Sequence, residues 1–249
     1  MDLELKNKVA IVTGGSKGIG KAIARELACE GADLVIAARG FQELKKTALE
    51  LANESGRRVI PLKADTSDIG QVTRMVNDTI SNLGKIDILI NNAGVAQDLS
   101  LVEELGYEEF QSVIKDNVMN TFNMIKYVLP IMKKQNSGII INVSSRSGRR
   151  GVPRLSAYCA AKFAVRGLTE SVAKEVENNN IRCISISPGG VNTEMRRKLF
   201  GDEDAENQQP TSRIINIITK ILSEQIQVPN GADVLIVKDK DPIIKVPES

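Results

Sequence analysis

Short apolar runs alternate with longer amphipathic segments along most of the chain. Runs rich in Val, Ile and Leu are typical of buried strands. They lie at residues 9–12, 34–38, 59–63, 86–90, 138–143, 182–187 and 232–237. The segments between them carry apolar residues at helical spacing. This alternation predicts an α/β fold with a doubly wound parallel sheet of about seven strands and helices on both faces.

The chain of 249 residues contains no linker, internal repeat or low-complexity tract that would divide it. One α/β domain commonly reaches this length. We therefore expect a single domain over residues 1–249.

A glycine-rich loop directly follows the first predicted strand. It runs from Thr13 to Gly20, and a helical pattern begins at Lys21. Glycines let a backbone approach a pyrophosphate closely, and a helix N-terminus presents unpaired N–H groups to it. A P-loop for nucleoside triphosphates is excluded because Ala22 stands where a hydroxyl should bind magnesium. The loop by itself is compatible with a phosphate cradle or with a plain turn.

A tyrosine and a lysine lie four residues apart in a helical pattern that continues to Glu177. The spacing places Tyr158 and Lys162 on one helical face. A free phenol has a pKa of about 10, and a neighbouring ammonium lowers that pKa by stabilising the phenolate. Ser145, thirteen residues before Tyr158, follows an apolar strand and brings a hydroxyl to the carboxyl end of the sheet, where α/β sheets bind ligands. Together these residues predict a proton-transfer site.

These motifs occur in the order found in the short-chain dehydrogenase/reductase family, together with Asn91-Asn92-Ala93-Gly94 and the run from Pro188 to Thr193. The chain resembles that family along nearly its whole length, which implies a single-domain Rossmann fold. The resemblance implies four catalytic residues, which are Asn117, Ser145, Tyr158 and Lys162. It implies a cofactor site made of Gly14, Ser16, Lys17, Gly18, Ile19, Gly20, Arg39, Asp65, Thr66, Asn91, Ala93, Gly94, Tyr158, Lys162, Pro188, Gly189, Val191 and Thr193.

The end of the second strand indicates which cofactor is bound. An NAD enzyme usually places an acid there to bind the ribose hydroxyls and repel a 2′-phosphate. Ala37 and Ala38 occupy that place and Arg39 follows, while Lys17 lies in the glycine loop. The missing acid and the two cations predict NADP(H). Asp65 matches the family's adenine-contacting acid and is equally suited to cap a helix.

The sequence thus predicts an NADP(H)-dependent oxidoreductase that moves hydride between nicotinamide and a carbonyl or secondary alcohol. The 3-oxoacyl-(acyl-carrier-protein) reductases are the most similar subclass, which makes a 3-oxoacyl thioester one candidate substrate. The alternative is a dinucleotide-binding regulatory or scaffold protein without turnover, and the intact catalytic set favours the enzyme.

Two segments are expected to border the substrate. Residues 194–210 resemble the family's substrate lid, with a disordered surface loop as the alternative. Arg146, Arg149 and Arg150 follow the serine on the loop expected to line the cleft. They are candidates to hold an acidic or phosphorylated substrate, and solvated charges are the other interpretation.

The composition and charge of the chain limit the classes of partner that we expect it to bind. Lys and Arg number 33 against 31 acids, with 3% aromatic residues, so no basic or stacking surface for nucleic acid is expected. Residues 1–6 are charged and lack a signal-peptide core, and no apolar run approaches about 18 residues. We therefore expect a cytoplasmic protein with no membrane association. Three cysteines without metal-ligand spacing predict buried reduced thiols and no metal site.

The family resemblance also implies self-association. The helical segments at 108–133 and 157–177 correspond to the family's main dimer contact, so we expect a homo-oligomer. The tail at 238–249 lacks the Gly-Gly turn that many members use in tetramer contacts. A homodimer and a homotetramer both stay open.

Overall fold

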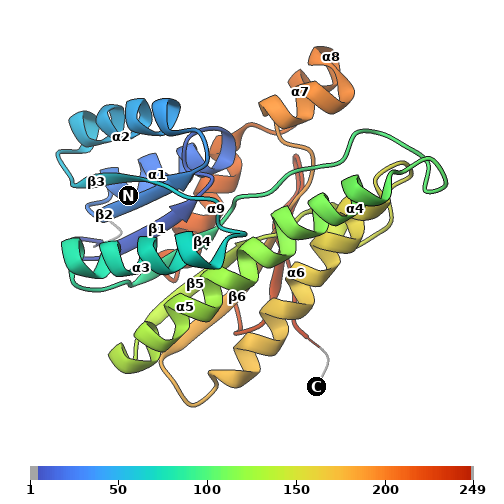
Figure 1. The fold of residues 1–249 in the computed structure, drawn as a ribbon. Coiled ribbons are helices and arrows are strands. Elements are labelled where there is room, and N and C mark those ends of the chain that lie inside the picture. Colours follow the sequence, from blue (N-terminus) through green and yellow to red (C-terminus); the bar gives the residue numbers. More distant parts are fainter. Residues whose placement is uncertain (1–4, 248–249) are drawn as a thin grey trace.

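A computed structural model describes residues 5–247 (Figure 1). The expectation about the charged opening segment at 1–6 falls mostly on residues 1–4, outside the described residues. The last two residues of the tail, 248 and 249, also lie outside them.

Strands and helices alternate in chain order. The strands are β1 (Val9–Thr13), β2 (Asp33–Ala38), β3 (Val59–Lys63), β4 (Ile88–Asn91), β5 (Gly138–Val143), β6 (Ile181–Pro188), β7 (Asp233–Ile236) and β8 (Ile243–Lys245). The helices are α1 (Gly18–Cys29), α2 (Phe41–Ser55), α3 (Ile69–Leu83), α4 (Tyr107–Ile114), η1 (Lys115–Met119), α5 (Asn120–Gln135), η2 (Arg146–Gly148), α6 (Ser156–Glu175), α7 (Glu194–Phe200), α8 (Asp202–Glu206) and α9 (Thr211–Leu222).

The strands form one sheet in the order β3-β2-β1-β4-β5-β6-β7-β8. All neighbouring pairs are parallel except β7 with β8. The strand order reverses between β1 and β4, so the connections after these two strands leave on opposite faces. A crevice at their carboxyl ends follows from this topology. The predicted doubly wound α/β fold is confirmed.

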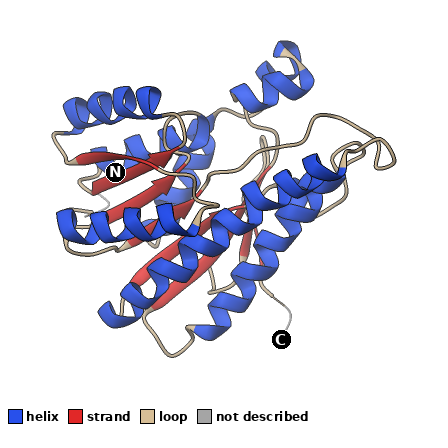
Figure 2. Cartoon of the chain, in the orientation of Figure 1, coloured by secondary structure: helices blue, strands red, loops and turns tan. Residues whose placement is uncertain are grey.

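Helices cover both faces of the sheet (Figure 2). Side chains alternate between faces along a strand. On β1, Ala10 and Val12 pack with α1, α2 and α9, whereas Ile11 packs with α3, α5 and α6. Both faces are therefore buried, which explains why the strands are continuous apolar runs instead of alternating ones.

The sheet has one strand more than the sequence pattern predicts. The tail turns back after β7, and β8 pairs antiparallel with it, with Val234 opposite Ile244. Ile244 packs against the apolar core, whereas Ile243 is 52% exposed. Exposure alternates along Ile243, Ile244 and Lys245, as expected of an edge strand with one face on the core.

One long helical segment contains a change of helical type. Between α4 and α5, residues Lys115–Met119 form a π-helical turn, η1. Large apolar side chains on this segment and on α6 face outward, including Phe110, Phe122 and Phe163. The expected dimer contact falls on this surface, and it stays a prediction.

The cysteines depart partly from expectation. Cys159 and Cys183 are buried free thiols, but Cys29 is exposed at the last residue of α1. The expectation that all three are buried is wrong because position 29 falls on the solvent side of the helix. Within the described part of the chain, no helix combines the length and apolarity needed to cross a bilayer.

The added strand generates a test of stability. Replacing Ile244 by Asp places a charge against the core, and we expect the free energy of unfolding to fall by about 1–3 kcal/mol. Replacing the exposed Ile243 by Asp should change it by less than about 0.5 kcal/mol. Urea denaturation of both variants measures the difference. Equal losses would show that β8 does not pack on the core as described.

Candidate active site

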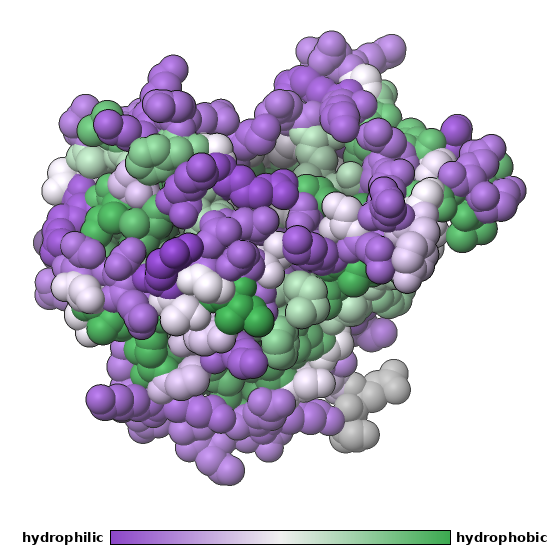
Figure 3. All heavy atoms as spheres, in the orientation of Figure 1, coloured by the Kyte–Doolittle hydropathy of each residue, from purple (hydrophilic) through white to green (hydrophobic). Residues whose placement is uncertain are grey.

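A cavity of about 680 Å³ lies at the carboxyl ends of the central strands. The space-filling view shows the surface hollowed between α2 and the α7–α8 pair (Figure 3). Of the residues that the sequence singles out, the cavity is lined by Gly14, Ser16, Lys17, Gly18, Ile19, Arg39, Asp65, Thr66, Ala93, Gly94, Asn117, Ser145, Tyr158, Lys162, Pro188, Gly189, Val191 and Thr193.

The structure does not bring two expected cofactor residues to the cavity wall. Asn91 is buried in β4, where its amide donates to Asn142 Oδ1 at 2.8 Å. Gly20 packs inside the loop, where an added Cβ would collide with the Gly14 carbonyl oxygen. Gly20 thus belongs to the packing of the loop, whereas Asn91 joins β4 to β5.

The glycine loop leaves the start of α1 open toward the cavity. Gly14 and Gly18 adopt positive φ values of 65° and 58°, a region that glycine enters without strain. No side chain caps the first N–H groups of α1. A phosphate could therefore accept from these groups while lying against bare backbone. The loop fits the dinucleotide that the sequence predicts.

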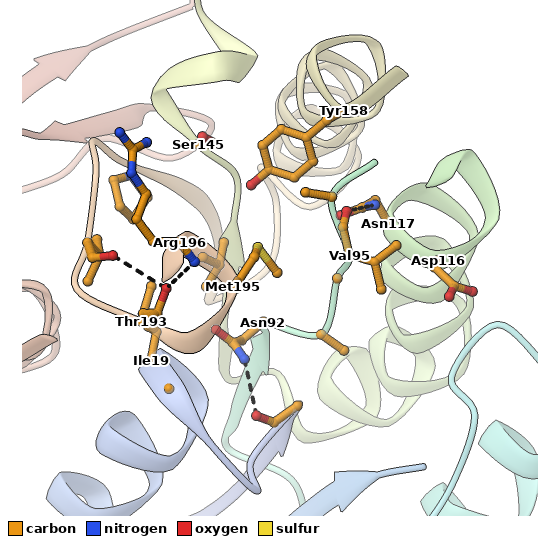
Figure 4. Close-up of a pocket in the computed structure, with 18 of the residues that line it drawn as sticks. Ile19, Asn92, Val95, Asp116, Asn117, Ser145, Tyr158, Thr193, Met195 and Arg196 are labelled. Carbon is orange, nitrogen blue, oxygen red and sulfur yellow. Dashed lines mark hydrogen bonds between the residues drawn. The ribbon is translucent and has the colours of Figure 1, made fainter. Parts of the chain in front are cut away.

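Two residues that the sequence-based site omits hold this loop in place. Thr13 Oγ1 accepts from the backbone N–H groups of Asn92 and Ala93, each at 3.0 Å. The Asn92 side chain returns a bond to the Thr13 carbonyl at 3.0 Å and a longer one to the Gly14 carbonyl at 3.4 Å (Figure 4). Asn92 also lines the cavity. Both residues lie inside the two motifs quoted above, so these motifs could have identified them as part of the site.

Each of the two expected phosphate-binding cations is paired with an acid in this structure. Lys17 Nζ lies 2.7 Å from Glu194 Oε2, and Arg39 Nη1 lies 2.8 Å from Asp116 Oδ2. All four side chains belong to residues that line the cavity. Glu194 and Asp116 are 177 and 77 residues away from their partners, so no local pattern could identify them.

Asp65 does not cap α3. Its carboxylate accepts from the N–H of Ser67 at 2.9 Å, whereas Asp68 provides the cap by accepting from Gln71. Burial favours the neutral form of Asp65, but the hydrogen bonds from Ser67 outweigh it and hold the pKa below its ordinary value. An ionised Asp65 thus remains on the cavity wall beside Thr66.

Ser145 and Tyr158 both line the cavity. Ser145 caps η2, with its Oγ accepting from Ser147 N–H at 3.1 Å. Tyr158 projects from the first turn of α6 into the same space (Figure 4). Burial raises the pKa of Tyr158, and a hydrogen bond with Ser145 acts in the opposite direction. In this structure Ser145 is therefore the residue that lowers the pKa of Tyr158, whereas the sequence predicts that Lys162 lowers it.

Lys162 is buried beneath the tyrosine. Its ammonium donates to the Val143 carbonyl at 2.9 Å and lies 5.6 Å from the centre of the Tyr158 ring. Burial lowers the pKa of Lys162 from 10.5 to about 8. Its charge is therefore retained at neutral pH but is held weakly.

Asn117 lies within the π-helical turn, across a glycine from this lysine. Its amide donates to the carbonyls of Val95 and Val113, both at 2.8 Å (Figure 4). Its buried Oδ1 has no hydrogen-bond partner among residues 5–247. A Cβ added to Gly94 would lie 2.5 Å from that oxygen and 3.3 Å from Lys162 Nζ. Asn117 Oδ1 and the Lys162 ammonium thus lie on either side of the space beside Gly94, and the unpartnered oxygen can accept a hydrogen bond there.

The expected lid is helical. Thr193 caps α7, and α8 follows within the stretch for which a disordered loop was the alternative. Arg196 on α7 pairs with Asp204 on α8 and stacks on Phe200, with 3.9 Å between guanidinium and ring centre. Whether this pair moves over a substrate stays a prediction.

The three arginines after the catalytic serine separate. Arg146 and Arg150 line the cavity, and neither has an acidic partner among residues 5–247. Arg149 turns inward, and its Nε lies 3.0 Å from the buried Asp233 carboxylate. The expectation that Arg149 lines the substrate cleft is wrong because an internal ion pair holds its side chain.

Residues 5–247 contain no group of three or more His, Cys, Asp and Glu side chains arranged to hold a metal ion. The polar groups of the cavity are hydroxyls, amides and charged side chains, some of them paired.

Comparison with known proteins gives a consistent result. A family model described as short chain dehydrogenase matches residues 8–204. An NADPH-dependent pterin aldehyde reductase from Arabidopsis thaliana is 34% identical over 216 residues, covering 87% of this chain and 88% of that protein. A 3-oxoacyl-(acyl-carrier-protein) reductase from Chlamydia muridarum is 38% identical over 199 residues, covering 80% of each chain.

Solved structures agree on the fold. The crystal structure of levodione reductase superposes with a TM-score of 0.89 and 30% identity, covering 94% of this chain and 97% of that chain. Two further neighbours carry cofactors. A short chain dehydrogenase from Shigella flexneri is complexed with NADP (TM-score 0.87, 28% identity, 93% and 97% covered), and a 3-ketoacyl-(acyl-carrier-protein) reductase from Brucella melitensis with NADH (0.87, 26%, 94% and 98%).

The buried ammonium generates a prediction about pH and stability. Because the pKa of Lys162 is lower in the folded state, the unfolded chain takes up this proton more readily. The destabilisation is complete below about pH 8 and fades as the pH rises toward the ordinary lysine value. Lys162→Met should therefore raise the free energy of unfolding by about 1–3 kcal/mol at pH 7, and by less at pH 10.

Chemical denaturation at the two pH values measures this difference. The exposed Lys45 on α2 provides the control, because Lys45→Met should change stability little at either pH. A Lys162→Met variant no more stable than wild type at pH 7 would mean that the Val143 contact offsets the burial of the ammonium.

Proposed function

This chain belongs to the short-chain dehydrogenase family, and on that premise we propose that it is an NADP(H)-dependent carbonyl reductase or alcohol dehydrogenase. Family membership and the reductase relatives support a dinucleotide-dependent oxidoreductase that acts on carbonyl or alcohol groups. The observation that carries the proposal is that Ser145, Tyr158 and Lys162 line the same cavity as the glycine loop.

Bound NADPH would supply the hydride for the reduction. Tyr158 donates its phenolic proton to the carbonyl oxygen as the carbonyl carbon is reduced, so that an alcohol forms. Ser145 holds that oxygen by a hydrogen bond. Lys162 binds the nicotinamide ribose, and its charge stabilises the phenolate that remains. In alcohol oxidation the same groups act in reverse, with the phenolate as the base.

Asn117 completes this proton path in our proposal. Its unpartnered Oδ1 and the Lys162 ammonium face the same bare backbone at Gly94. A water molecule accepting from the ammonium and donating to this oxygen would return a proton from solvent to Lys162 and Tyr158. The unpartnered acceptor supports this role because it lies beside the ammonium, where a bridging water would satisfy it.

We further propose that the cofactor is NADP(H). Lys17 and Arg39 would exchange their carboxylate partners for the 2′-phosphate when it binds. The acids that pair with Lys17 and Arg39 leave both cations at the cavity wall. A phosphate dianion offers each cation a stronger acceptor than one carboxylate. No acid stands at Ala37 or Ala38 to repel it.

The substrate is a small carbonyl compound in this proposal. Val95, Val152, Leu155, Met195 and Leu199 give its end of the cavity an apolar wall. Arg146 and Arg150 stand at the same end without acidic partners in the described chain, which favours a substrate that also carries an anionic group. Reductases of 3-oxoacyl thioesters and of pterin aldehydes among the relatives define the first compounds to assay.

The decisive experiment follows NADPH consumption against acetoacetyl thioesters, diketones, quinones, sugars and keto acids. With any compound that is reduced, Tyr158→Phe should lower kcat at least about 100-fold with nearly unchanged NADPH affinity, because only the phenolic hydroxyl transfers the proton. Tyr107→Phe is the matched control, since Tyr107 is 74% exposed on α4. A Tyr158→Phe variant that kept more than about a tenth of wild-type activity would remove the proton-donor role.

A second prediction concerns cofactor choice. Ala38→Asp combined with Arg39→Ala should shift the ratio of kcat/KM values toward NADH by roughly ten- to hundredfold, through lost attraction and added repulsion. Steady-state kinetics with both cofactors at low salt measures the ratio. Arg74→Ala, at an exposed arginine on α3, should leave it unchanged. Wild-type protein with equal preference for NADH and NADPH would contradict the assignment.

A further inference from the structure

A buried carboxylate outside the cavity joins the two elements that carry the proposed catalytic residues. Asp233, the first residue of β7, is 1% exposed. Its Oδ1 accepts from the hydroxyls of Ser185 and Ser187 at 2.6 and 2.7 Å. Its Oδ2 lies 3.0 Å from Arg149 Nε and 3.3 Å from Arg166 Nε. Oδ2 lacks a well-aligned hydrogen bond, so its attraction to the two guanidinium groups is mainly coulombic.

The two arginines come from different elements. Arg149 ends η2, the short helix that Ser145 caps. Arg166 lies on α6, one turn after Lys162, and also donates to the Gly148 carbonyl at 2.9 Å. One carboxylate thus connects β7, η2 and α6. Arg166 forms a second connection between α6 and η2.

The backbone of η2 packs closely against α6. A Cβ added to Gly148 would lie 2.6 Å from the Lys162 carbonyl oxygen. The neighbouring Ser144 hydroxyl donates to the same oxygen at 2.9 Å. The backbone of η2 therefore rests directly on the helix that presents Tyr158 and Lys162, and Ser145 is one residue from that contact.

Charge balance explains why the carboxylate is needed there. Arg149 and Arg166 are both largely buried, and the only other acid close to either is the half-exposed Glu170, 3.6 Å from Arg166 among residues 5–247. Without Asp233 the two guanidinium groups repel each other in a medium of low dielectric. Because η2 has three residues whereas α6 has twenty, η2 would shift before α6 does.

We propose that Asp233 and Arg149 are positioning residues that fix where Ser145 lies relative to Tyr158. They touch neither cofactor nor substrate and act through the loop between β5 and α6. The kinetic part of the test rests on the proposed function, whereas the spectroscopic part does not.

The first variant is Arg149→Gln, which leaves Asp233 paired with Arg166. The Ser145 hydroxyl lowers the pKa of the Tyr158 phenol, and a Ser145 displaced from the phenol lowers that pKa less. The titration midpoint of Tyr158 should therefore move upward, by about half a pH unit or more. The chain has three tyrosines and no tryptophan, so the ultraviolet band of the phenolate can be followed directly. Subtracting the Tyr158→Phe titration isolates this residue.

Kinetics provide the second measurement. Arg149→Gln should lower kcat about tenfold or more, because small displacements of reacting groups are costly, while KM for NADPH stays within about twofold. Combined with Ser145→Ala, it should produce little further loss, because Arg149 acts through Ser145. Arg149→Met, which keeps the apolar stem volume, replaces the Gln variant if that protein does not fold.

Arg57→Gln is the control. It breaks the Arg57–Asp33 pair, 2.9 Å long, at the amino end of β2. It should lower stability without changing the Tyr158 titration or kcat. The proposal is overturned if Arg149→Gln behaves in the same way, or if its effect on kcat is as large in the Ser145→Ala background. Lack of carbonyl reduction by wild type would refute the proposed function alone, since the titration still tests the positioning.

Discussion

The hydrogen bonds between Thr13 and Asn92 join the ends of β1 and β4, and the whole cavity is arranged around that joint. On one side Thr13 leads into the glycine loop, and on the other side Asn92 leads to Gly94, which faces Lys162 and Asn117. The proposed cofactor cradle and the proposed proton path are thus built on one rigid connection. Since it lies where the strand order reverses, the fold itself creates the crevice that these bonds then shape.

The sequence could predict the placement of residues that lie in local motifs. The glycine loop, the Tyr158–Lys162 pair and Ser145 lie in short motifs beside predicted elements, and the structure brings them into one cavity. The sequence could not predict placements that depend on distant partners. The inward turn of Arg149 depends on Asp233, 84 positions later in the printed sequence. No local pattern marks the π-helical turn or the return of the tail as β8 either.

The site places polar groups beside the aliphatic layers of the sheet without satisfying all of them. A lysine is buried beneath Tyr158, and the nearby Asn117 Oδ1 has no partner among residues 5–247. Such groups oppose folding. They persist because the apolar layers on both sides of the sheet supply a surplus of stability, and the same rigid layers keep the unfavourable groups in place.

The two edge strands of the sheet affect whether the chain can pair with other chains while it folds. Its outer strands are β3 and β8, whose free backbone groups could otherwise recruit a strand from another chain. β3 carries Pro61, which lacks an N–H donor, and β8 is only three residues long and carries the exposed Lys245. Lateral growth into an aggregate is therefore opposed at one edge by a missing donor and at the other by a short strand bearing a charge.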